Sequence, residues 1–148
     1  DITDGTSNTM SMGERAFGKL SPSVQKCYMW WASGVISDSL QTTFYPMNVE
    51  KRLKDITSGT VSSNVGFDAF IMAFGSFHPG GANFVFCDGS VKFLKETIDT
   101  WQFDMTNGVP IGVTQPGLTF VVAPGTRIGV YQALSSRAGG EVISADSY

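Results

Sequence analysis

The sequence predicts an α+β domain made mainly of antiparallel strands, with one or two short helices. An Asp88-Gly89 pair between two apolar runs is the strongest short-range signal for a β-hairpin. The 17 glycines, with many Ser and Thr residues, are typical of a turn-rich chain that contains strands. Helical periodicity is clear in only one segment, residues 48–58. The 148 residues suit a single globular domain, 1–148, with a sizeable core.

The predicted hairpin covers residues 83–94, and its register follows from the turn. A two-residue type I′ turn at Asp88-Gly89 is expected, because both of its central residues need a positive φ. Side chains alternate across each strand, so counting back from the turn gives one apolar face that must be buried and one mixed face. The apolar face consists of the pairs Phe84–Phe93 and Phe86–Val91, and the mixed face of Val85, Cys87, Ser90 and Lys92.

Three segments precede the helical pattern. Residues 9–15 predict a short strand that ends at Gly13-Glu14, with Met10 and Met12 on one side. Residues 21–23 read as a turn around a proline. Residues 27–32 are apolar and aromatic, which predicts a buried strand.

The predicted helix starts with Asn48 as its N-cap and runs to Ser58. Apolar residues recur there at helical spacing, and charged residues fill the other positions as a solvated face. Gly59 ends the pattern. The apolar positions are Val49, Leu53 and Ile56.

Beyond the hairpin the signals are shorter. Residues 96–103 predict a second short helix that carries Ile98 and Trp101. Residues 118–123 predict a strand. A turn over 137–140 is expected between the segments 130–135 and 141–144.

Composition excludes some classes of function. The net charge is −3 and no run of Lys or Arg occurs, which argues against a nucleic-acid partner. No apolar stretch approaches the ~20 residues that cross a bilayer. The start at Asp1 reads as the start of a processed or partial chain. Cys27 and Cys87 permit one disulfide, and both a pair and two separate buried thiols stay open.

The single histidine, His78, is the main candidate for chemistry. An extended strand over 83–87 places Asp88 roughly 16 Å from Asn83, at about 3.3 Å per residue. We therefore expect His78 and Asp88 at opposite ends of the hairpin, each anchoring local backbone. There is no Gly-x-Ser-x-Gly elbow, phosphate-binding loop or zinc-ligand cluster, so neither an enzyme nor a cofactor is expected.

The sequence also offers two candidate ligand sites. Asp4, Asn8 and Glu14 are calcium candidates, although Asx-type turns explain Asp4 and Asn8 equally well. The aromatic residues at 28, 30 and 31 could line a ligand or glycan site, but adjacent bulky apolar residues are more often core.

Three ordered motifs resemble a known family. They lie at residues 2–9 with Gly13-Glu14, at residues 78–83 with 88–91, and at residues 137–144. This order is similar to the carboxy-terminal part of a large bacterial family of prepilin-like proteins of unknown function, labelled by a His-x9-Asp-Gly signature. The signature residues here are His78, Gly80, Gly81, Asn83, Asp88, Gly89, Arg137, Gly139, Gly140 and Glu141.

The resemblance implies a pilin-like globular head without its amino-terminal apolar helix, as in type IV pilins and type II secretion pseudopilins. It implies an exported protein at the cell surface, in the periplasm or outside the cell. Its partners would be other pilin-like subunits or the missing amino-terminal part, and membrane contact would come only through that absent helix. No catalytic residues come with the resemblance.

We therefore expect a non-catalytic structural subunit of a surface filament or envelope assembly. The alternative is an extracellular module that binds a solute or glycan. Burial of Trp30, Trp31 and Trp101 would weaken this alternative, whereas an open cleft between two of them would favour it. The sheet should be incomplete, with an exposed edge or apolar face.

Overall fold

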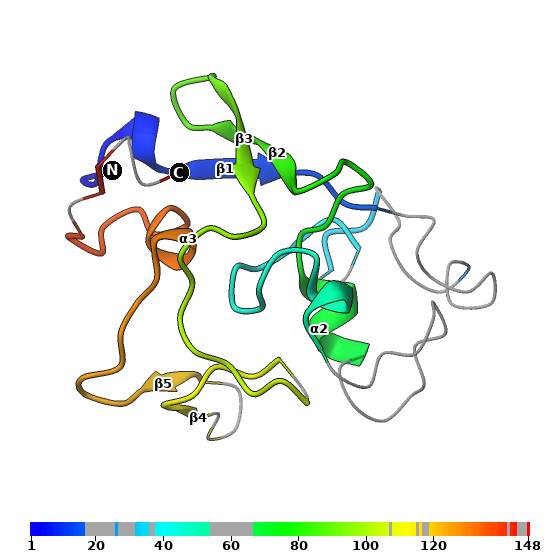
Figure 1. Cartoon of the computed structure of the whole chain (residues 1–148). Coiled ribbons are helices and arrows are strands. Elements are labelled where there is room, and N and C mark those ends of the chain that lie inside the picture. The colour runs from blue at the N-terminus through cyan, green and yellow to red at the C-terminus, as the bar shows by residue number, and fades with distance from the viewer. Residues whose placement is uncertain are drawn as a thin grey trace.

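The computed structural model describes residues 1–16, 26, 32–35, 38–53, 67–106, 108–114, 116, 119–141, 143–144 and 148. Two antiparallel sheets and short helices make an α+β arrangement, which confirms the predicted class (Figure 1). The elements are η1 (Thr6–Asn8), β1 (Met10–Gly13), η3 (Val49–Lys51), α2 (Phe67–Met72), β2 (Gly81–Phe86), β3 (Val91–Lys95), β4 (Val113–Thr114), β5 (Val121–Val122) and α3 (Val130–Ala133).

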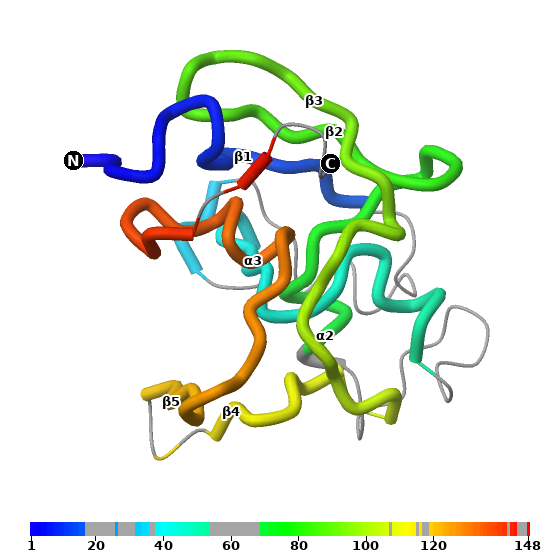
Figure 2. The backbone as a smooth tube through the Cα atoms, turned by 60° about the vertical axis from the view of Figure 1, so that its left-hand side comes forward, coloured from blue at the N-terminus to red at the C-terminus, as the bar shows by residue number. Residues whose placement is uncertain are grey.

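The larger sheet has the order β1-β2-β3, and both pairings are antiparallel. Its inner face packs against one core cluster that includes Met47, Tyr131 and Leu134. A second cluster joins α2 to η3 around Val49 and Phe70. The β4–β5 ribbon lies at the opposite end of the molecule from the larger sheet, as both views show (Figures 1 and 2).

The predicted hairpin forms, but its register differs by one residue. Val85 lies opposite Val91, and Phe84 lies opposite Lys92. The cause is a three-residue connection: Gly89 N–H donates to the Phe86 carbonyl at 2.9 Å, and Phe86 N–H donates to the Ser90 carbonyl at 2.9 Å. Only Gly89 in this loop has a positive φ, which fits a type I turn followed by a glycine bulge instead of type I′.

This shift turns β3 over, because a slip of one residue exchanges the two faces of a strand. Phe84, Phe86 and Leu94 point into the core. Val91 and Phe93, which the sequence placed in the core, are exposed on the other side. Lys92 instead lies on the inner side, with its ammonium group 4.3 Å from the centre of the Phe86 ring.

The strand predicted over 9–15 is β1, but its two methionines do not share a side. Met10 pairs with Phe86 and Met12 with Val85, so an irregularity in the register falls at Ser11. Such a bulge adds one residue and reverses the alternation. Met10 therefore packs against the core, whereas Met12 is 68% exposed.

The helix predicted from Asn48 appears only as the single 3-10 turn η3 within the described residues, and 54–60 lie outside them. Asn48 is not its capping side chain: its φ is 50° and it makes no capping bond. Val49 and Leu53 are buried as the periodicity indicated.

The prediction of a helix over 96–103 is wrong, because those residues form turns and extended chain, although Ile98 and Trp101 are buried. The strand predicted over 118–123 shrinks to β5, and residues 130–133 form α3. Helix α2 was not predicted. The turn at 21–23 and residues 27–31, with Cys27, lie outside the described residues, and Cys87 is a free thiol.

The larger sheet has an apolar outer face, defined by Met12, Val85, Val91 and Phe93, of which all but the half-buried Val85 are exposed. This confirms the expectation of an exposed apolar face. In the described ranges, no helix combines the length and the apolar character needed to cross a bilayer.

Candidate functional site

The Glu14 carboxylate is the centre of a polar cluster at the edge of the larger sheet. It follows β1 and receives Asn83 N–H at 2.8 Å and the Asn83 side-chain amide at 3.1 Å. His78 Nε2 lies 3.2 Å from Oε1, the oxygen that also accepts the Asn83 side-chain amide. The end of β1 and the start of β2 are thereby joined through one carboxylate.

The electrostatics favour the charged form of Glu14. Burial is the largest single influence and raises its pKa. Hydrogen bonds from the Asn83 backbone and side chain, a bond with Ser76 and the charge of His78 act the other way, and the net result is a lowered pKa. Glu14 is therefore an ionised acceptor at neutral pH.

A shallow hollow of about 290 Å³ opens beside this cluster, lined by Glu14, Ser76 and His78 among others. His78 is half exposed there, and its ring meets Phe93 edge-on with 6.4 Å between centroids. Its backbone N–H donates to Ser76 Oγ at 3.1 Å. The histidine thus lies beside a carboxylate in an open hollow.

A buried asparagine extends the cluster inward. Asn48 Oδ1 accepts Ser76 N–H at 2.9 Å, and Asn48 Nδ2 donates to Glu96 at 2.9 Å. Lys51 Nζ lies 2.6 Å from the same Glu96 oxygen. Sequence reasoning treated Asn48 only as a helix cap and missed Ser76 and Glu96, because no local pattern signals bonds across such separations.

The two glycines after His78 serve different purposes. Gly80 has a φ of 79°, a backbone conformation that favours glycine. Gly81 has an ordinary φ but no room: a Cβ there would lie 2.8 Å from the Phe93 ring and would meet the Leu94 carbonyl. Phe93 therefore covers the start of β2.

Asp4 connects the first motif to the last. Its two carboxylate oxygens accept Gly139 N–H at 2.7 Å and Gly140 N–H at 3.1 Å. The Arg137 carbonyl accepts Thr3 N–H at 2.8 Å. We call this set of contacts the terminal clasp. Glu141 follows it, with one carboxylate oxygen buried and unpartnered within the described structure.

Asp88 anchors the hairpin turn. Its Oδ1 accepts Ser90 N–H at 2.9 Å and the Ser90 hydroxyl at 2.7 Å. Its own N–H donates to the Thr6 carbonyl at 3.1 Å, which ties η1 to the turn. As expected, His78 and Asp88 lie beyond opposite ends of β2.

The calcium candidates do not converge. Asp4 and Asn8 precede β1 and Glu14 follows it, so a strand separates them. Asn8 Oδ1 accepts the Tyr148 hydroxyl at 3.1 Å, and Asp4 binds residues far along the chain, so local Asx turns were also the wrong explanation. Within the described ranges, no group of three or more His, Cys, Asp or Glu residues could hold a metal ion.

Residues 1–100 match a family model, SBP_bac_10, described as a protein of unknown function (DUF1559). This chain belongs to the DUF1559 family. No curated protein and no solved structure matches it. The Glu14 cluster and the Asp88 turn lie inside the matched residues of this DUF1559 chain. The glycines of the terminal clasp and the β4–β5 ribbon lie beyond them.

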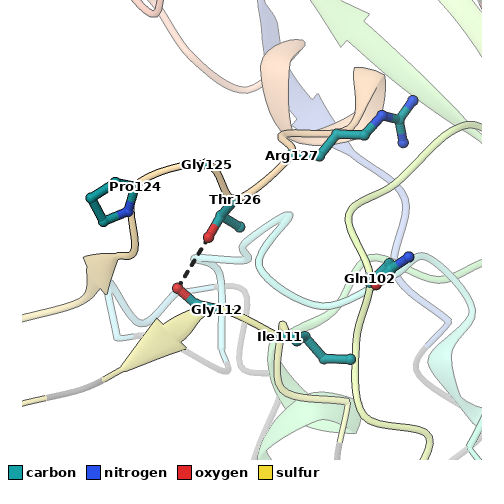
Figure 3. Close-up of a pocket in the computed structure, with 7 residues that line it drawn as sticks. All are labelled: Gln102, Ile111, Gly112, Pro124, Gly125, Thr126 and Arg127. Atoms are coloured by element: carbon teal, nitrogen blue, oxygen red, sulfur yellow. Dashed lines mark hydrogen bonds between the residues drawn. The ribbon is translucent and has the colours of Figure 1, made fainter.

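A second hollow, of about 370 Å³, lies in the part of this DUF1559 protein beyond the match. Figure 3 shows Thr126 donating its hydroxyl to the Gly112 carbonyl at 3.3 Å on one side, while Ile111, Gln102 and Arg127 surround the other. Arg127 forms a two-pronged pair with Asp99, with both N–O distances 2.9 Å. The hollow is open and partly polar.

Proposed function

We propose that this chain is a non-catalytic structural subunit: the globular part of an exported pilin- or pseudopilin-like protein in a surface filament or envelope assembly. The observation that carries the proposal is the exposed outer face of the sheet. Val91 is 64% exposed and Met12 68% exposed, although both lie on strands of the larger sheet. Contiguous exposed apolar side chains on a sheet are typical of an interaction surface.

The motif residues support a structural role. Glu14 binds Asn83, Asp4 binds Gly139 and Gly140, and Asp88 binds Ser90. Each carboxylate accepts internal N–H groups, although Glu14 also lines the open hollow beside His78. Such bonds fix the chain path, and a subunit that packs against copies of itself needs a fixed surface.

Catalysis has less support. His78 has a carboxylate neighbour, which the enzyme reading required. Nucleophilic chemistry also needs a nucleophile within reach of the base. The adjacent hydroxyl, Ser76 Oγ, is on a buried residue and already takes part in bonds with His78 N–H and Glu14. The pair therefore serves best as an anchor.

The alternative, a solute- or glycan-binding module, draws on the hollow in Figure 3. Burial of the three tryptophans would weaken this alternative, and of the three only Trp101 lies among the described residues. Trp101 is buried, and its indole N–H donates to the Phe44 carbonyl at 3.0 Å. Trp30 and Trp31 lie outside the described residues.

Sedimentation velocity of the full chain over a range of concentrations tests the proposal. We expect reversible association that Val91→Glu weakens at least about tenfold, because burying a valine is worth about 1.5–3 kcal/mol and a charge adds a penalty. Val35→Glu is the matched control, since Val35 is also a valine, is 61% exposed and is not on the outer face.

Two results would refute the proposal. One is a chain that stays monomeric at every concentration. The other is a Val91→Glu variant that associates as strongly as Val35→Glu, with both showing native circular dichroism.

A further inference from the structure

The β4–β5 ribbon carries a second exposed apolar surface. Val121 is 47% exposed and its neighbour Val122 is exposed as well, although successive strand residues point to opposite faces. Ile111, just before β4, is 57% exposed. The ribbon therefore presents apolar side chains on both of its faces.

The ribbon also lacks charge. Residues 105–126 contain no Asp, Glu, Lys or Arg. Exposed strands of soluble proteins are usually guarded by charged side chains, which discourage association. The ribbon therefore offers no charges to bind a charged partner such as a nucleic acid, but its apolar side chains can bind another apolar surface.

The ribbon is too small to be stable alone. Each strand has two residues, and an isolated two-stranded ribbon is marginal in water. Phe120 attaches it to the body through Phe44, with 4.7 Å between ring centroids. Val113 is half-buried, but Val121 and Val122 face solvent, so covering them would stabilise the ribbon.

We propose that the ribbon of one copy docks on the outer face of the sheet of a second copy. This inference rests on the proposed function, and it identifies the β4–β5 ribbon as the element that binds the outer face. The ribbon and the larger sheet, which carry the two surfaces, lie at opposite ends of the molecule (Figures 1 and 2). One head-to-tail contact covers both, whereas ribbon-to-ribbon pairing leaves the outer face exposed. The uncharged ribbon also meets no like-charge repulsion from Lys95 at the sheet or from a chain of net charge −3.

Such a contact joins two different surfaces. It therefore does not close on itself in a pair, and it generates a ring or an open filament.

Complementation between two variants of the full chain tests this contact. Val91→Glu disables the outer face and leaves the ribbon intact, and Val121→Glu does the reverse. We expect each variant alone to associate at least about tenfold more weakly than wild type. An equimolar mixture, with one variant carrying a distinguishing mass label, should form a mixed dimer and stop there, since only one good contact remains.

The controls keep the outcomes separable. Val35→Glu should assemble like wild type, and circular dichroism checks each fold. Ile111→Glu replaces Val121→Glu if the latter does not fold.

Normal assembly of folded Val121→Glu would overturn this inference and leave the proposed function intact. Normal assembly of Val91→Glu would overturn both. A mixture of the two folded variants that stays monomeric would also overturn this inference, because the intact ribbon of Val91→Glu would then fail to bind the intact outer face of Val121→Glu. Co-sedimentation of wild type, but not Val121→Glu, with phosphatidylcholine vesicles, without self-association, would make a lipid surface the occupant.

Discussion

Replacement of Glu14 by Gln should lower the free energy of unfolding by about 2 kcal/mol. Gln keeps the shape but replaces one acceptor oxygen with an NH₂ group, which then faces donors from Asn83 or His78. A hydrogen bond to a charged group is worth about 1.5–3 kcal/mol, and the partial exposure of Glu14 favours the lower half of that range. Urea denaturation measures the change directly, and the melting temperature should fall by about 4–8 °C.

The pH dependence gives a second readout. The pKa of Glu14 is lowered in the fold from its ordinary value of 4.5. The carboxylate therefore stabilises the protein fully above that ordinary value, and the contribution is lost as the pH falls through the lower folded pKa. Wild type and Glu14→Gln should differ most at neutral pH and converge in acid.

A double-mutant cycle with Asn83→Ala isolates the contact. Coupling of about 1 kcal/mol is expected because the two side chains touch, whereas Val35→Thr should be additive with Glu14→Gln. The reasoning fails if Glu14→Gln costs less than about 0.5 kcal/mol, which is the range of ordinary surface substitutions.

Two paired substitutions test the backbone arguments, each by urea denaturation. Gly81→Ala should be several times more destabilising than Gly80→Ala. The Cβ at position 81 would overlap Phe93 and the Leu94 carbonyl, whereas the Cβ at position 80 meets nothing. Gly80→Ala therefore costs only the strain of a positive φ, about 1 kcal/mol. Equal losses would contradict the packing argument. Asn48→Gly should be more stable than Asn48→Ala by about 0.5–1 kcal/mol, since both lose the side-chain bonds but only Ala is strained at a φ of 50°. The opposite order would show that the left-handed backbone relaxes.

Local signals predicted the hairpin and β1, but not the details of their pairing. An Asp-Gly pair suits both the two-residue type I′ turn and the three-residue turn with a glycine bulge, since Gly89 has a positive φ in either. The choice depends on which face of β3 meets the core. The bulge at Ser11 has no sequence marker, so Met12 was placed on the wrong side.

Helices were harder to predict for a similar reason. Helix α2 is a short, mainly apolar segment whose one charged residue, Asp68, does not make the charged face of an amphipathic helix, and four-residue α3 is too short for periodicity. The cap assigned to Asn48 is locally reasonable, but tertiary bonds to Ser76 and Glu96 determine its conformation.

The sequence pointed to some residues of the candidate site, but it did not predict their hydrogen-bond partners. Glu14 and Asp4 stood out in their motifs, yet their partners lie 69 and 135 positions away. A single sequence holds no record of such pairs. Only the structure shows that Asn83 and Gly139 complete them.

The terminal clasp has a mechanical consequence. Because Asp4 holds Gly139 and Gly140, Thr3 holds Arg137 and Tyr148 binds Asn8, tension applied between residues 1 and 148 is borne first by these few bonds. They can part while the sheet, whose pairings lie behind them along the chain, stays intact. Under load, the protein would therefore open at these terminal contacts before the outer face of the sheet is distorted.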